Sequence, residues 1–170
     1  WFRSIYEESP IGIGFYRADG YVIEMNKSFL EIFGVSNAEE VKDFNLFQDP
    51  NLTKEVKEKL ANKEKIRYEI DFDFENIKQK KLYETSRSGS VYLDVLITPL
   101  VEKEENDPYG YLVQVVDIND RRQNEKQLQA EQDTVHSIEW MLSKKTKGGE
   151  NYIPEYGDVS SLNKDGIILT

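Results

Sequence analysis

The most regular hydrophobic pattern of the chain lies between residues 66 and 75, where apolar and charged positions alternate. A period of two residues is typical of a β-strand with one buried and one solvated face. Other short apolar runs lie beside turn signals such as Asp19-Gly20 and Ser88-Gly89, as strands of a hairpin do. Five strands are therefore expected, at residues 11–16, 21–25, 66–75, 91–100 and 111–116.

Short helices are expected between the second and third of these strands. Asn26 stands before an apolar-periodic run as an N-cap would, and Gly34 follows that run as a C-terminal stop would. Ser36 and Glu39 have the spacing of a capping box at the start of another helix. A further helix is expected over Thr53–Lys63, with its apolar residues on one face.

The order of the elements predicts an α+β fold. After a first short helix at residues 1–8 come two strands, a cluster of helices and then three strands. Lys78–Lys81 is expected to be a basic loop, and Leu82–Thr85 is expected to continue strand pairing. Because the last three strands have hairpin-like connections, the sheet should be antiparallel with the short helices on one face.

The last strand runs without a Gly or Pro into a polar segment at Asp120–Lys145, so a long C-terminal helix is expected there. Leu128, Val135 and Leu142 repeat every seven residues, with Ile138 at a second heptad position. This short pattern fits a parallel dimer of two such helices. The alternative is an amphipathic helix that folds back on its own sheet.

Several of these pieces resemble the PAS domain, a sensory module found in front of histidine kinases, cyclases and phosphodiesterases. They are Glu8–Ile13 at the first strand, the Asp19-Gly20 hairpin, the Asn26–Phe29 helix start, Phe33-Gly34, and the closing Asp117–Arg121. The resemblance covers roughly residues 1–128. Asn119 stands where the family pattern has Thr, and Asn can still cap the helix that follows.

The resemblance implies a five-stranded antiparallel sheet of order 2-1-5-4-3, curved around a cavity that the short helices close. A PAS-like sensor domain is then expected over residues 1–119, and a signalling helix over 120–147. Residues 148–170 are expected to be an extended linker or the start of a downstream domain. The resemblance also implies that events at the cavity reach this helix through Asp117, Ile118, Asn119, Asp120 and Arg121.

The side chains expected to line the cavity would suit a small apolar or aromatic metabolite. We favour the simpler interpretation that these side chains only fill the core. Haem-binding PAS domains use a His before the third strand, but the one His of this chain is His136. The chain has no Cys for a flavin adduct, and the cofactor remains unknown. The expected cavity wall is Tyr68, Ile70, Phe72, Val95, Ile97, Val113 and Val115.

Composition narrows the function. The net charge of −10 argues against a nucleic-acid partner or an anionic membrane surface, and no run is long and apolar enough for a membrane span.

The acidic row from Glu69 to Glu75 is expected to be a solvated face rather than a metal site. No catalytic residue pair or phosphate loop is visible. His136 lacks the following Glu and the Pro usual beside a phosphoacceptor.

The sequence therefore predicts a cytoplasmic PAS sensor module of a two-component signalling protein. The expected signalling protein is a histidine kinase with a downstream output domain. The fragment itself is expected not to be an enzyme, and a homodimer through residues 120–145 is its expected assembly. The alternative is a ligand-free structural dimerisation module with a filled core.

Overall fold

The computed structural model describes residues 1–102 and 107–147. The chain divides into two compact units, which meet between Gln123 and Asn124. Within the described ranges, no helix is long and apolar enough to cross a membrane. The linker expected at residues 148–170 lies outside the described residues.

The first unit contains a five-stranded sheet of order β2-β1-β5-β4-β3 with every pair of neighbours antiparallel, as predicted. In the middle of the sheet, Val95 pairs with Tyr68 on one side and with Val115 on the other. The strands are β1 (Gly12–Arg17), β2 (Val22–Met25), β3 (Ile66–Asp73), β4 (Ser90–Leu100) and β5 (Gly110–Asp117).

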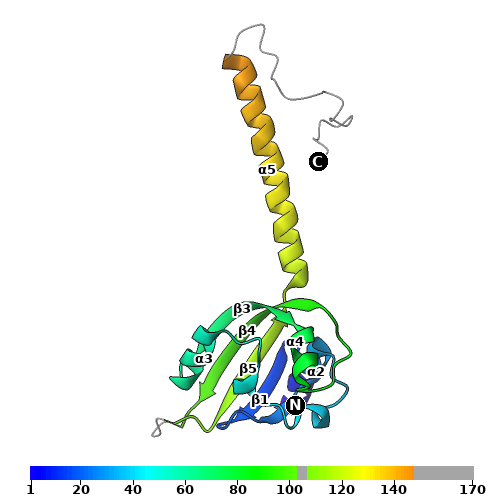
Figure 1. Ribbon diagram of the computed structural model, residues 1–170, viewed down its shortest axis with the longest axis vertical. Coiled ribbons are helices and arrows are strands. Elements are labelled where there is room, and N and C mark those ends of the chain that lie inside the picture. Colours follow the sequence, from blue (N-terminus) through cyan, green and yellow to red (C-terminus); the bar gives the residue numbers. More distant parts are fainter. Residues whose placement is uncertain (103–106, 148–170) are drawn as a thin grey trace. The chain divides into compact units, whose positions relative to one another are not determined.

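Short helices lie on one side of this sheet (Figure 1). The predicted caps are confirmed: the Asn26 side chain accepts a hydrogen bond from the Phe29 N–H, and Gly34 has a φ of 66°, a left-handed conformation that glycine adopts without strain. The helical elements are α1 (Phe2–Glu7), α2 (Lys27–Phe33), η1 (Ala38–Val41), η2 (Leu46–Gln48), α3 (Lys54–Ala61), α4 (Phe74–Lys80) and α5 (Asn119–Lys147).

The prediction of a strand to residue 75 followed by a basic loop was wrong. β3 ends at Asp73, and α4 occupies the next seven residues. The Asp73 carboxylate accepts the Glu75 N–H at 2.9 Å, and Phe74 and Ile77 are both fully buried. Because these two apolar residues are three positions apart, one helical turn buries both of them, which a strand cannot do.

Two smaller predictions were also wrong. Residues 82–85 form no strand; instead the Thr85 hydroxyl donates to the Phe33 carbonyl at 2.6 Å and so satisfies the end of α2. The helix expected to begin at Ser36 is the 3₁₀ turn η1, which Asn37 caps by accepting the Glu39 N–H at 3.0 Å. Glu40 accepts the Ser36 N–H at 3.2 Å.

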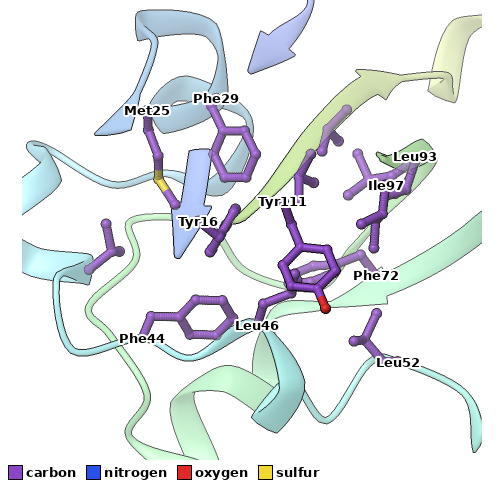
Figure 2. Close-up of a cluster of buried hydrophobic side chains, with 14 of the residues drawn as sticks. Tyr16, Met25, Phe29, Phe44, Leu46, Leu52, Phe72, Leu93, Ile97 and Tyr111 are labelled. Atoms are coloured by element: carbon purple, nitrogen blue, oxygen red, sulfur yellow. The ribbon is translucent and has the colours of Figure 1, made fainter. Parts of the chain in front are cut away.

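The hydrophobic core lies between the sheet and the helical layer. In Figure 2, side chains of the sheet such as Leu93 and Ile97 face Phe29 of α2 and the Phe44–Leu52 segment across a shared interior. β3 and β4 therefore have an inner face toward the core and an outer face that carries charged side chains.

Candidate functional site

A cavity lies inside this core, between the inner face of the sheet, α2 and the segment that contains η1 and η2. The structure brings together around it all of the side chains expected as a cavity wall. Whether this cavity binds a ligand stays a prediction. The wall residues are Tyr68, Ile70, Phe72, Val95, Ile97, Val113 and Val115.

The space in the cavity is small, about 50 Å³. An apolar cavity of ~150 Å³ can bind benzene, so the smaller cavity of this protein has room for only a few non-hydrogen atoms in this conformation. Aromatic rings fill much of the interior: Phe33 meets Phe72 edge-on at 5.1 Å between ring centres, and Phe44 meets Tyr83 at 5.5 Å.

One corner of this apolar cavity is polar. Asp49, in the turn after η2, is 8% exposed and lines the cavity. One of its carboxylate oxygens accepts the Asn51 N–H at 2.9 Å. Burial raises the pKa of Asp49, since a carboxylate loses its hydration when it is taken out of water.

Three tyrosines surround the same corner. Burial raises the pKa of Tyr16, Tyr68 and Tyr83, and the charge of Asp49 raises each of them further. The four groups therefore lie close enough to interact electrostatically. Within the described part of the chain, none of these hydroxyls has a hydrogen-bond partner.

Sequence reasoning missed the polar corner. Asp49 belongs to none of the elements or sites that we expected from the sequence, and Tyr83 was expected to continue strand pairing. The available signal was weak, because an acidic residue before a proline is common in turns that have no other role.

The start of α5 is attached to β4 by backbone and side-chain hydrogen bonds. The Ile118 N–H donates to the Tyr92 carbonyl, and the Tyr92 N–H donates to the Asn119 side chain, both at 2.9 Å. Asn119 is thus not the cap that we predicted, because its side chain reaches a neighbouring strand instead. Asp117 accepts the Asn119 N–H at 2.9 Å.

Charged side chains attach the same helix to β3. Arg121 and Arg122 both form ion pairs with Glu69, and the Arg122 guanidinium lies over the Tyr92 ring, 5.6 Å from its centre. Asp120 is exposed in the first turn of α5, where a negative charge is favourable at a helix N-terminus. Glu69, Tyr92 and Arg122 are therefore junction residues that the sequence did not reveal.

The acidic row of β3 has separate local partners. Glu69 pairs with α5, Asp73 caps α4, and Glu75 forms an ion pair with Lys78 at 3.2 Å. Among the residues that the structure describes, no three or more His, Cys, Asp or Glu side chains form a group that could hold a metal ion.

The second unit contains the remainder of α5. His136 is exposed on this helix. The predicted heptad positions Leu128, Val135 and Leu142 are each more than half exposed, at 56%, 55% and 57%, and Ile138 is 43% exposed.

Residues 1–67 match the family model described as PAS domain. The PAS domain of a protein from Colwellia psychrerythraea is 16% identical, with 70% of this chain and 95% of that chain covered and a TM-score of 0.51. A Light-Oxygen-Voltage protein of Rhodobacter sphaeroides is 10% identical, with 69% and 64% covered and a TM-score of 0.51.

An RNA-binding Light-Oxygen-Voltage receptor is 13% identical, with 78% of this chain covered and a TM-score of 0.58; the match spans only 36% of that receptor. Identities this low show the fold alone. A comparison with curated proteins finds no match. The family match, together with the strand order and the fold of the first unit, shows that the chain contains a PAS domain, a class of sensory domain.

Proposed function

We propose that this PAS domain is the sensor of a cytosolic histidine kinase, in which the state of the cavity alters the start of α5. One observation carries the proposal: β3 and β4 line the cavity with their inner face and hold α5 with their outer face. On β3, Glu69 stands between the cavity residues Tyr68 and Ile70. A displacement of this strand therefore acts on both sites.

The mechanism requires two arrangements of the outer strands that a ligand or partner distinguishes. A shift of β3 changes the distance from Glu69 to Arg121 and Arg122, and a shift of β4 changes the hydrogen bonds of Tyr92 to Ile118 and Asn119. A small set of ion pairs and hydrogen bonds can switch between two arrangements while the core stays folded. In this proposal the PAS domain has no catalytic activity of its own, and an output domain carries that activity.

A double-mutant cycle tests the relay. Ile70→Ala enlarges the cavity, and Glu69→Gln removes the charge that holds both arginines. We expect Ile70→Ala to speed amide exchange at Ile118 and Arg122 several-fold relative to amides of the β1–β2 hairpin, and we expect Glu69→Gln to remove most of this difference. Non-additive effects of this kind measure coupling between two sites.

Asp71→Asn is the matched control, because Asp71 is exposed two positions further along β3. The coupling between residue 70 and α5 should persist in that background. If Ile70→Ala had the same effect with and without Glu69→Gln, the relay through β3 would be wrong.

The kinase assignment is tested on the full-length protein with labelled ATP. We expect an acid-labile phosphohistidine outside this domain, and His136→Gln should retain it. Turnover of a cyclic nucleotide without phosphohistidine would contradict the assignment and place the domain in another class of signalling protein.

The small cavity and the exposed apolar positions of α5 favour a second candidate, a structural dimerisation module without a ligand. It predicts a dimer whose population rises with concentration in analytical ultracentrifugation. Val135→Glu should dissociate this dimer, whereas Ser137→Glu, which places the same charge at an exposed position outside the heptad pattern, should leave it intact. It also predicts that no small molecule raises the thermal midpoint. A monomer at all concentrations would exclude this candidate.

A further inference from the structure

The polar corner of the cavity contains one acidic side chain and no basic one. Asp49 lines the cavity with Tyr16, Tyr68 and Tyr83, whereas no Lys, Arg or His is among the lining residues. The other walls include the aromatic side chains of Phe29, Phe33, Phe44 and Phe72.

We propose that this cavity binds a small ammonium cation, such as ammonium or methylammonium, with Asp49 as its counter-ion and the tyrosine hydroxyls as hydrogen-bond acceptors. The inference rests on the proposed sensor function, because it names the ligand class of the same cavity.

Electrostatics favours a cation over an anion. A carboxylate, phenol oxygens and the faces of aromatic rings all present negative potential, and aromatic faces attract ammonium groups. The cations that influence Asp49 are Lys57 of α3 and Lys80 of α4, and neither side chain lines the cavity. A bound anion would therefore meet the Asp49 carboxylate and no positively charged side chain of the cavity wall.

Size limits the ligand to a few non-hydrogen atoms. The space is about 50 Å³, which suits ammonium or a methylated ammonium and excludes an aromatic metabolite in this conformation. The chemistry and the dimensions of the cavity thus lead to the same class of ligand.

The hydrogen bonding of the Asp49 carboxylate supports a bound cation as its counter-charge. Within the described residues it is hydrogen-bonded only to Asn51, through the Asn51 N–H and the Asn51 side chain. Both donors are neutral, and a buried carboxylate without an adjacent counter-charge is costly. A cation at this corner would compensate the charge and bond to tyrosine hydroxyls that have no hydrogen-bond partner among the described residues. A polar residue that is buried only for structural reasons usually has protein partners for all of its polar atoms, which the three tyrosines lack among the described residues.

The ligand should bind more tightly as Asp49 ionises. Besides the two lysines, the titratable groups that face Asp49 are Tyr16 of β1, Tyr68 of β3 and Tyr83. Because burial raises the pKa of Asp49, the apparent affinity should rise as the pH increases above the ordinary value of 3.8 and become constant once the carboxylate is fully ionised.

Thermal unfolding of the whole chain with methylammonium chloride tests the proposal, with potassium chloride at the same concentration as reference. We expect methylammonium to raise the midpoint by about 4 °C or more at saturation. Asp49→Asn, which retains the size and the acceptor of the side chain, should abolish the rise. Tyr83→Phe should weaken binding several-fold in a methylammonium titration.

Asp71→Asn is again the matched control, because it removes an exposed carboxylate that does not line the cavity, and it should retain the full response. Equal midpoints in the two salts, an unchanged response in Asp49→Asn, or stabilisation by sodium acetate in its place would each overturn the ammonium proposal. The relay experiment with Glu69→Gln uses no ligand, so failure here leaves the proposed sensor function separately testable.

Discussion

Two parts of the core contain buried polar side chains that differ in how well they are hydrogen-bonded. Asn26, fully buried at the junction of β2 and α2, donates to the carbonyls of Tyr6 and Ile11 at 2.9 Å and accepts from the N–H groups of Ile13 and Phe29. Asp49, in the turn before α3, is 8% exposed, and among the described residues it is hydrogen-bonded only to Asn51, through the N–H and the side chain of that residue.

The difference separates a structural polar group from a candidate functional one. Asn26 has neutral partners in every direction and joins α1, β1 and α2 into one unit. Asp49 has a charge and an adjacent cavity. A buried polar group that is fully hydrogen-bonded contributes specificity to the fold, whereas a buried charge without a counter-charge reduces stability and is a candidate site for a ligand.

The largest expected effect is that of Asn26→Asp. The carboxylate retains the two accepted hydrogen bonds but places an oxygen opposite the carbonyls of Tyr6 and Ile11, so we expect a loss of about 3 kcal/mol in the free energy of unfolding. Urea titrations followed by circular dichroism measure it.

Asn45→Asp is the matched control, since the Asn45 amide makes one donated bond, to the Asp19 carbonyl at 2.8 Å, and should lose less. An equal loss of unfolding free energy at the two positions would show that the number of hydrogen bonds that the amide donates does not determine the loss.

Asp49→Asn should act in the opposite direction. Burial raises the folded-state pKa of Asp49 above 3.8, so the native protein binds a proton more tightly than the unfolded chain. The free energy of unfolding therefore falls as the pH rises from 3.8 to the folded-state pKa. The amide should therefore stabilise the ligand-free protein by about 1 kcal/mol at neutral pH, and the gain should vanish below the ordinary pKa. Urea titrations between acid and neutral pH measure this; a less stable variant at neutral pH would show that Asp49 already has a counter-charge.

The smallest expected effect is at Asp94, on the outer face of β4. Arg67 forms two hydrogen bonds to it, at 2.7 and 3.1 Å, and these lower the pKa of Asp94. A depressed pKa stabilises the fold above the ordinary value, and the contribution is lost as the pH falls through the folded-state pKa. Asp94→Asn should therefore cost less than about 1 kcal/mol at neutral pH.

The pH series of Asp94→Asn also provides a check on Asp49→Asn. The two substitutions should have opposite signs at neutral pH, and both differences should disappear in acid. A stabilising Asp94→Asn would indicate that the pair with Arg67 contributes nothing to the folded state.

The sequence by itself determined the features that depend on neighbouring residues. The Asp19-Gly20 hairpin, the Asn26 cap, the Gly34 stop and the alternation from Ile66 to Phe72 are all confirmed, because turns, caps and strand periodicity are set by interactions over a few positions. The strand order was expected from the resemblance to the PAS domain rather than from these local signals.

Local pattern failed where one residue suits two structures. Phe74 continues the alternation of β3 and also begins the apolar face of α4, and burial beside Ile77 decided in favour of the helix. Asn119 could cap a helix, but the register of the sheet places the Tyr92 N–H within its reach.

Tertiary structure alone decided the two sites. Tyr16, Asp49, Tyr68 and Tyr83 are distant in sequence and meet only because the helical layer closes over the curved inner face of the sheet. Glu69 is on β3, and Arg121 and Arg122 follow β5. They meet because the strand order places only one strand, β4, between β3 and β5. Long-range pairings of this kind depend on the whole packed arrangement, so no short stretch of sequence contains them.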